Sequence, residues 1–485
     1  MATRESSASS LASESEENSR APLIQPDFSP PREYGATILP RFPGWWAALG
    51  PGVIWMALAQ GSGELIWWPY FCAKYGLGFL FLLAPACLLQ YAVTFEIGRY
   101  SALTGESIWR GFVRLHPLFG FVLWILMAIS FLWFGAFATA GGTAMARLVE
   151  WPDLDERGRS LFWALLSMVV FAFALLTQKR TYQLIEKVMW AVALTTIAGL
   201  IVSCFGKPVR GFWPEFLQAM FVPPPLARPW ESGDTDRLLT AITFAGLGGF
   251  WTLFYSYWIL GKGTGCARHR LSHGAVPNSA EGSLAVEGAR WRRFLLLDTG
   301  IGVFGNLATT LMACFLAYVV LFPKGIVPDE WRLAAEQSQF FAGAWGEMGR
   351  LLFLLISAAF LCDTWLSTAD AVARVHIEML RFYFVRNRVV DERRWYRIMI
   401  LILTGITGLT MFANQPGTLI VLSALIGFLG TVIFTFALIF LVHGPLRRAL
   451  PDPLKPGKAS LILLSISAIA YTLLAVAYVW VKFFF

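Results

Sequence analysis

Charge is scarce in this sequence, and the scarcity excludes a soluble globular protein. Only 14% of the 485 residues are Asp, Glu, Lys or Arg, whereas 56% are hydrophobic. Soluble domains carry about 25% charged residues, so we expect the chain to lie in a membrane. The net charge of +8 does not indicate a nucleic-acid partner, because the basic residues gather in alternate loops and fit membrane orientation instead.

Cysteine and histidine are also few, and neither shows the spacing of a metal-binding motif or a disulfide framework. The six cysteines stand apart, without a CxxC pair or a Cys/His pattern, which excludes a zinc site and a disulfide framework. All five histidines fall in predicted loops or at predicted helix ends. The sequence shows neither a phosphate-binding loop nor a nucleophile–base pair. We therefore expect no enzyme activity and no cofactor.

Long apolar runs are what the chain does contain, and they predict an all-α integral membrane protein. We expect residues 1–42, rich in Ser, Glu and Pro, to form a disordered cytoplasmic tail rather than a signal peptide. Residues 43–485 then form one transmembrane domain. Eleven segments in it are long enough to cross a core of about 30 Å, with approximate limits 45–73, 77–100, 118–146, 160–178, 184–205, 237–260, 294–322, 346–372, 396–413, 416–442 and 459–482.

Basic residues mark every second loop and predict the orientation. Basic groups begin at Arg99, Lys179, Lys262, Arg381 and Arg447, while the intervening loops are short or of mixed sign. By the positive-inside rule the N-terminus is cytoplasmic, and an odd number of spans places the C-terminus outside. We expect a cytoplasmic membrane, a lipid environment and a chain able to work as a monomer.

The first span is interrupted by Gly61, Ser62 and Gly63, followed at once by Glu64. Glycines weaken a helix, and a carboxylate is expensive in hydrocarbon. Irregular backbone at membrane depth is tolerated only where it is buried in protein or lines a cavity. The pattern predicts a broken helix with a solute site at the break. The alternative is a kinked helix whose Glu64 pairs with a neighbour or reaches the interface.

A second interruption follows five spans later, at 245–252, and includes Phe250, Trp251 and Thr252. Paired glycine-interrupted segments in two halves indicate a transporter built from inverted repeats. The repeats would cover about 43–205 and 236–442, with 459–482 as an extra helix. The alternative is that these glycines only let helices pack closely.

Four stretches carry a family resemblance. They are GPGVIWMALAQGSGE (50–64), LLQYAVTFEIGRYSALTGES (88–107), YQLIEKVM (182–189) and LLLDTGIGVFGNLA (295–308). Their order and spacing resemble the Nramp (natural resistance-associated macrophage protein) family of divalent metal transporters over nearly the whole membrane region. The resemblance implies a LeuT-type fold of eleven helices, with a 5+5 inverted repeat, broken helices 1 and 6, and transport by alternating access.

The chain departs from this family where the family binds metal and moves protons. Nramp proteins carry Asp-Pro-Gly-Asn in the first helix, Met-Pro-His with a later His in the sixth, and an acidic pair in the third. Without the sulfur and nitrogen ligands that select transition metals, the resemblance is to a divergent member. At the positions of these family motifs, the chain has Gly61, Ser62, Gly63 and Glu64 in the first span, Phe250, Trp251, Thr252 and Tyr257 in the sixth, and Ala140 and Thr143 in the third.

Two carboxylates remain as candidate ligands of a metal or another substrate. Glu64 stands at the break, and Asp363 lies near the middle of the eighth span, which borders the site in LeuT-type folds. The alternative for Asp363 is a structural acid hydrogen-bonded to its neighbours. Asp370 follows seven residues later on roughly the same helical face, and we expect it to serve an inner gate or coupling with Tyr255 and Tyr257.

Three functions follow. The preferred one is transport of a metal cation, such as the hard divalent Mg²⁺, which takes oxygen ligands and keeps several waters. The first alternative is transport of a small organic solute such as an amino acid, with its carboxylate on free backbone N–H groups and its amine at Glu64. The second is a membrane sensor that transports nothing, although the chain has no sizeable soluble domain to pass on a signal.

Overall fold

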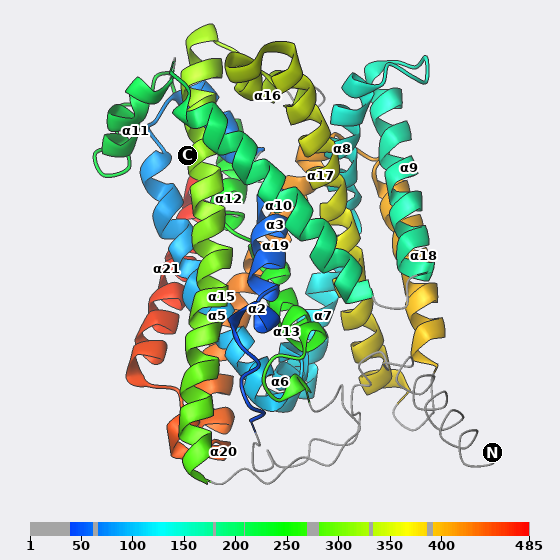
Figure 1. Ribbon diagram of the computed structural model, residues 1–485, viewed down its shortest axis with the longest axis vertical. Helices are drawn as coiled ribbons and strands as arrows, with labels where there is room; N and C mark the ends of the chain where they lie inside the picture. The colour runs from blue at the N-terminus through cyan, green and yellow to red at the C-terminus, as the bar shows by residue number, and fades with distance from the viewer. Residues whose placement is uncertain are drawn as a thin grey trace, which may run out of the picture.

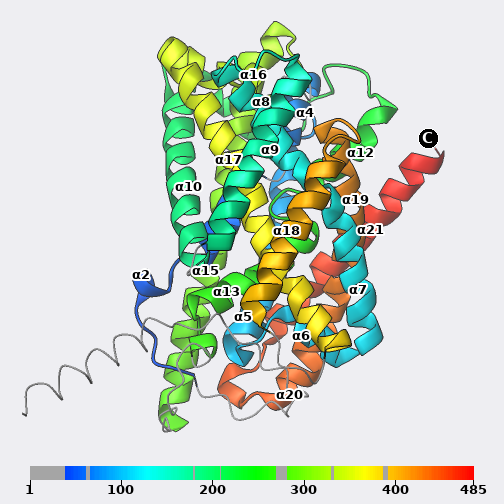
Figure 2. The same ribbon diagram turned by 90° about the vertical axis from the view of Figure 1, so that its right-hand side faces the viewer.

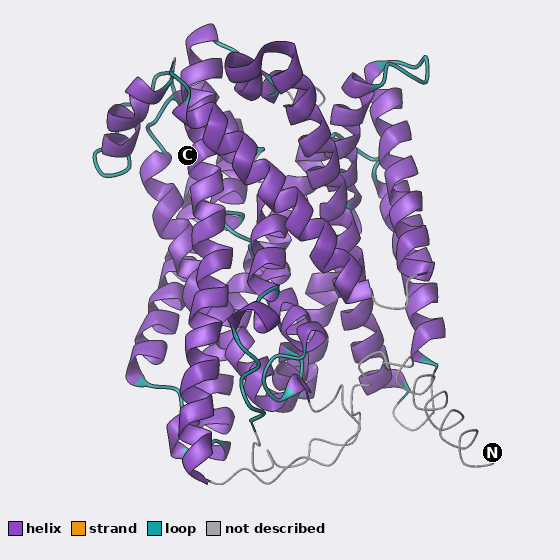
Figure 3. Cartoon of the chain, in the orientation of Figure 1, coloured by secondary structure: helices purple, strands orange, loops and turns teal. Residues whose placement is uncertain are grey.

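The computed structural model describes residues 39–61, 66–177, 181–207, 209–268, 281–328, 333–385 and 391–484. Throughout these ranges the regular structure is helical (Figure 3). Most of the predicted tail lies outside them. The long helices are α5 (Leu83–Thr104), α7 (Pro117–Ser130), α8 (Gly135–Leu148), α9 (Glu156–Thr177), α10 (Thr181–Phe205), α15 (Glu281–Leu316), α17 (Gln339–Phe384), α18 (Glu392–Thr410), α19 (Pro416–Leu441) and α21 (Lys458–Phe484).

Two further segments are interrupted helices, as the glycine patterns predicted. The first consists of α3 (Pro51–Ala59) and α4 (Trp67–Tyr75). The second consists of α12 (Thr235–Thr243), the 3₁₀ turn η6 (Gly249–Phe254) and α13 (Tyr255–Lys262). Eight helical stretches of the described chain are long and apolar enough to span a membrane. With α18 and the two interrupted segments they are consistent with eleven crossings.

The interrupted helices lie inside the bundle and the continuous ones surround them. Helix α3 contacts α10, α13 and α15, while α17 packs on α8, α10 and α18. Helices α9 and α18 form one flank, and α21 lies on the opposite flank against α5 and α19 (Figure 1; Figure 2 shows the second view). The outer flanks expose apolar side chains, such as Phe173 on α9 and Leu473 on α21. The protein is an integral, multi-pass membrane protein.

One end of the bundle, where the described chain begins, is called the N-side, and the opposite end, where α21 finishes, is called the C-side (Figure 1). The N-side carries α2 (Trp45–Ala48), α6 (Ile108–Leu115) and α20 (Arg447–Ala449); the C-side carries α11 (Trp213–Ala219), η5 (Ser232–Asp234), α16 (Leu333–Gln337) and the end of α21 (Figure 1). The sequence did not predict the short helices, because hydropathy detects only segments long enough to cross a membrane.

One prediction about histidine is wrong. His376 is not in a loop or at a helix end, because α17 continues to Phe384. Its Nδ1 atom lies 2.8 Å from the Val372 carbonyl, and its ring packs on Trp124. The charged Arg374 ended the apolar run in the sequence, yet its charge is neutralised by Asp370 one turn earlier. The helix therefore continues past the end that hydropathy indicated.

Candidate functional site

The second helix break depends on glycines that no other residue could replace without strain. Helix α12 ends at Thr243, and Gly246 and Gly248 have φ angles of 134° and 62°. Residues with a side chain rarely adopt such angles. A Cβ atom on Gly248 would also lie 2.1 Å from the Thr243 carbonyl oxygen. The chain therefore leaves the helix here and exposes backbone groups in the middle of the bundle.

Gln90 of α5 satisfies those backbone groups. Its Nε2 donates to the carbonyls of Thr243 and Ala245 at 3.1 and 3.3 Å, and its Oε1 accepts from the Gly248 N–H at 3.1 Å. Unpaired backbone groups in a membrane cost several kcal/mol each, so one side chain stabilises the open turn. Gln90 was not among the predicted site residues, although a buried amide in an apolar span is a detectable signal.

The structure describes the residues that flank the first break on both sides. Gln60 and Gly61 are buried directly after α3, and the described chain resumes at Ile66. Gln60 donates from Nε2 to Thr309 Oγ1 of α15 at 3.0 Å, and its buried Oε1 has no partner among the described residues. Ser62, Gly63 and Glu64 lie outside the described residues. Their roles as ligands stay predictions.

Phe250 and Trp251 join the second break to the neighbouring helices. The Trp251 indole donates to Thr368 Oγ1 of α17 at 3.0 Å, and its ring lies 4.4 Å from that of Phe131. Phe250 stacks on Trp109 at 6.2 Å and fills the space beside Gly430 of α19. Both side chains are fully buried. They position the break by packing, and Thr252 is buried beside them.

Asp363 is the unusual residue of α17. It is 1% exposed, and neither carboxylate oxygen has a hydrogen-bond partner among the described residues. The helix packs tightly against α8 at this turn, because a Cβ atom on Gly141 would lie 3.0 Å from the Cys362 backbone nitrogen. A structural acid would be expected to accept hydrogen bonds. The lack of a partner among the described residues is unusual for a structural acid, and both roles of Asp363 stay predictions.

The predicted gate residues take part in contacts toward the N-side. Asp370 accepts two hydrogen bonds from Arg374, at 2.9 and 3.0 Å, and one from the Tyr396 hydroxyl of α18 at 2.6 Å. Tyr255 donates to Asp298 of α15 at 2.7 Å. These contacts link α17 to α18 and α13 to α15, so the N-side end of the bundle is held together by buried polar pairs.

Tyr257 belongs to a second N-side contact that the sequence did not predict. Its hydroxyl donates to Glu378 of α17, whose carboxylate also accepts from Ser107 at 2.7 Å. A further ion pair joins Lys262 at the end of α13 to Glu186 of α10 at 2.6 Å. Residues scattered over four segments converge here, which no sequence spacing indicates.

The C-side has its own polar cluster, centred on Asp234 of η5. Its carboxylate accepts hydrogen bonds from Lys74 at 2.8 Å, Tyr75 at 2.7 Å, Tyr70 at 3.0 Å and Arg237 at 3.0 Å. Burial by itself would raise the pKa of Asp234, but these hydrogen bonds outweigh it and lower the pKa below its ordinary value. The cluster ties α4 to the start of α12.

No group of three or more His, Cys, Asp or Glu side chains capable of holding a metal ion occurs among the residues that the structure describes. A metal site built wholly from such side chains is therefore not found within those ranges. Any cation bound beside Asp363 would have to draw the rest of its ligands from backbone carbonyls, amide side chains, water or undescribed residues.

Comparison with known proteins gives a distant sequence relative and clear structural neighbours. No family model matches the chain. The uncharacterized protein PM0681 of Pasteurella multocida is 22% identical over 408 residues, covering 82% of this chain and 85% of that protein. A mutant of the Eremococcus coleocola manganese transporter superposes with a TM-score of 0.60 at 12% identity, covering 91% of this chain and 88% of that one.

A second type of transporter also matches. The structure of MhsT in complex with L-phenylalanine superposes with a TM-score of 0.55 at 15% identity, covering 93% of this chain and all of that one. At such identities the likeness shows the fold alone. The fold is the LeuT type, which confirms the predicted fold class. The neighbours are transporters and not enzymes, in agreement with the prediction for this chain.

Proposed function

We propose that this protein is an Nramp-like secondary transporter that moves a metal cation across the membrane by alternating access. The observation that carries the proposal is the buried carboxylate of Asp363, which has no hydrogen-bond partner among the described residues. An uncompensated carboxylate is too costly to keep in a low-dielectric interior. A bound cation, or a proton between transport cycles, supplies the missing charge.

The position of Asp363 supports the same function. Helix α17 contacts α3 directly and reaches the second break through the hydrogen bond from Trp251 to Thr368. The carboxylate thus lies on a helix that adjoins both interrupted segments. The unpartnered Oε1 of Gln60 is another oxygen beside the first break. With Glu64 as the second predicted carboxylate, most of the candidate ligand atoms are oxygens. Oxygen ligands suit a hard divalent cation such as Mg²⁺.

The polar clusters at the two ends fit alternating access. Asp370, Tyr255 and Tyr257 would close the N-side, which we place in the cytoplasm, while Asp234 and Lys74 would close the C-side. Each cluster joins half of an interrupted helix to a neighbouring element. Breaking one cluster at a time would open the midplane to one side only. The repeats 43–205 and 236–442 would supply the two moving halves.

A small organic solute such as an amino acid is the second candidate. The glycine-rich breaks and the likeness to MhsT, whose solved structure holds L-phenylalanine, favour it. The side chains of Phe250 and Trp251 count against an aromatic cage, because both are already used in packing.

Uptake into proteoliposomes tests the proposal. Mg²⁺, Mn²⁺ and a pool of amino acids are offered to the wild type, Asp363→Asn and Glu64→Gln. Asp452→Asn, at an exposed position in the 3₁₀ turn η10 (Asp452–Leu454), is the matched control. Cation uptake that is lost in the first two variants and kept in the control supports the proposal. Amino-acid uptake without cation flux supports the second candidate. If none of these solutes is taken up, both candidate functions are wrong and the membrane sensor remains as the alternative.

A further inference from the structure

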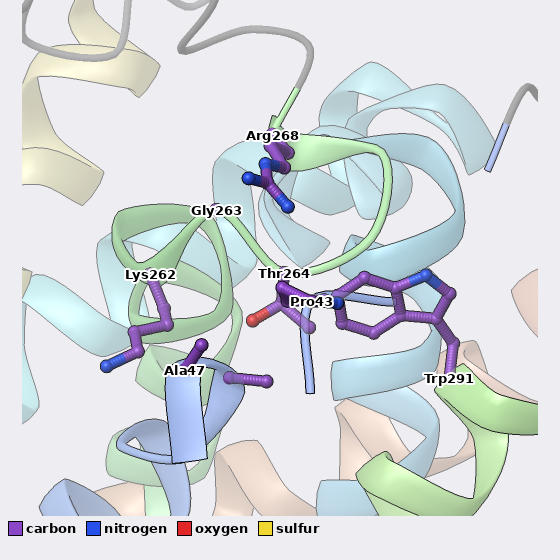
Figure 4. Close-up of a pocket in the computed structure, with 8 residues that line it drawn as sticks. Pro43, Ala47, Lys262, Gly263, Thr264, Arg268 and Trp291 are labelled. Atoms are coloured by element: carbon purple, nitrogen blue, oxygen red, sulfur yellow. The ribbon is translucent and has the colours of Figure 1, made fainter. Parts of the chain in front are cut away.

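A cavity of about 340 Å³ opens at the N-side, away from both helix breaks (Figure 4). Its walls come from α2 and Pro43 before it, from the end of α13 and the turn that follows, and from the N-terminal part of α15. Of the eight described residues that line it, Lys262 and Arg268 are cationic and none is acidic. Its volume lies within the usual range for small-ligand pockets, about 300–1,000 Å³. The charge of its lining predicts an anionic ligand.

Thr264 supplies a second and independent indication of a ligand. It lines the cavity, is 1% exposed, and its Oγ1 has no hydrogen-bond partner among the described residues. Figure 4 shows its hydroxyl between Lys262 and Trp291. Buried hydroxyl groups in folded proteins normally find a partner. A ligand oxygen would satisfy this one.

The cavity walls are fixed, so the site is preorganised. The Trp291 indole donates to the Pro40 carbonyl at 2.9 Å, and the Phe42 N–H donates to Glu287 at 2.7 Å. On the other wall, the Cys266 N–H donates to the Ala102 carbonyl of α5 at 2.7 Å. These contacts anchor the segment before α2 and the turn after α13 to separate long helices. Little ordering is then needed when a ligand binds.

Two tryptophans of α2 indicate the depth of the cavity in the membrane. Trp45 and Trp46 are 46% and 87% exposed, directly before Ala47 and Ala48 in the cavity wall. Exposed tryptophan is enriched at the level of lipid headgroups. Lysine, arginine and a hydroxyl at that depth match the oxygen atoms of a phosphate group.

We propose that this cavity binds a phosphate group, and specifically that of an anionic lipid headgroup in the N-side leaflet. Thr264, Lys262 and Arg268 contact the phosphate oxygens, and the Trp291 ring closes one wall. Lys262 also pairs with Glu186 of α10. A bound phosphate therefore shares this ammonium group with the N-side ion pair and regulates how readily α13 separates from α10. The site is independent of which solute the protein carries.

The test measures lipid binding to the full-length protein in neutral detergent. Native mass spectrometry and thermal melting compare phosphatidylglycerol, phosphatidylcholine and inorganic phosphate on the wild type, Thr264→Val and Arg268→Gln. Arg393→Gln, an exposed arginine at the N-side end of α18, is the matched control. We expect phosphatidylglycerol to bind the wild type and the control in preference to phosphatidylcholine. Each cavity variant should lose roughly tenfold in affinity, since each removes a hydrogen bond to a charged group.

The probes separate the two sources of phosphate. Binding of phosphatidylglycerol alone supports the lipid, whereas saturation by inorganic phosphate supports the phosphate site but assigns it to a soluble ligand. Equal binding by the wild type and both cavity variants would overturn the proposal, as would the absence of any preference for phosphatidylglycerol or phosphate. Thr264→Val preserves side-chain shape, so it tests the site even if Arg268→Gln folds poorly.

Discussion

Asp234 and Asp363 are buried to the same extent, each 1% exposed, yet their surroundings are opposite. Asp234 accepts hydrogen bonds from Lys74, Tyr70, Tyr75 and Arg237 at the C-side. Asp363 in the middle of α17 accepts none from the described residues. A fully partnered buried acid stabilises a contact between elements, whereas an unpartnered one costs free energy and is retained for what it binds. Under the function proposed above, the difference separates a structural carboxylate, Asp234, from the proposed ligand, Asp363.

Asp363→Asn is expected to have the largest effect, and on transport. Cation uptake into proteoliposomes should fall roughly 100-fold, because the variant loses the charge that compensates the cation. The melting temperature should stay level or rise, corresponding to about 1 kcal/mol, since a costly buried acid is removed. A large drop in melting temperature with normal uptake would show that Asp363 is structural and would remove the contrast with Asp234.

Asp234→Ala is expected to affect mainly stability. Lys74 and Arg237 would lose their shared carboxylate, and the free energy of unfolding should fall by about 3 kcal/mol, measured by reversible unfolding in mixed detergent. Adding Lys74→Met should restore part of the loss, because the second change removes a buried ammonium group. If the single variant melts like the wild type, the C-side cluster does not hold α4 against α12.

Gln90→Leu tests whether polar groups in the middle of the bundle are normally satisfied. The variant leaves the Thr243 and Ala245 carbonyls and the Gly248 N–H without their partner, which should cost about 2 kcal/mol of stability. Uptake should slow as the second break loses its support. Gln218→Leu, in the exposed helix α11, is the control and should change neither quantity. An unchanged melting temperature for Gln90→Leu would contradict the assigned role.

Low pH should reduce the stability that the C-side cluster contributes, whereas near neutral pH this contribution should hardly change. The pKa of Asp234 is lower in the folded protein than the ordinary value of about 3.9. Its stabilising contribution is therefore fully present above that value and is lost as pH falls through the folded pKa. Melting curves should show no loss from this group between pH 7 and about 5 and a loss below about 4. Asp234→Asn should remove that acid-dependent part, and an identical acid profile would refute the assignment.

Much of the fold was predictable because its signals are local. Apolar runs longer than a bilayer core is thick predicted the spans, and glycine clusters predicted both interruptions. The candidate site was only partly predictable. The sequence singled out Asp363, Asp370, Tyr255 and Tyr257 as candidates, and their roles stay predictions. It did not single out Glu378, Ser107, Gln90 and Asp234. Gln90 carried a signal as an amide inside an apolar span, whereas nothing in the local sequence of Glu378, Ser107 or Asp234 indicates which residues they contact.

The sequence by itself determined the membrane class, the positions of the helix breaks, and the lack of Met and His at the positions where the Nramp resemblance expects them. These properties depend on side-chain hydropathy and on backbone angles that only glycine adopts readily, and both are local. Only the tertiary structure decided which acids are paired. Lys74 and Asp234 are 160 positions apart, and the cavity wall joins Ala47, Lys262 and Trp291. Hydrogen bonds and ion pairs depend on distances between helices, which spacing along the chain does not encode.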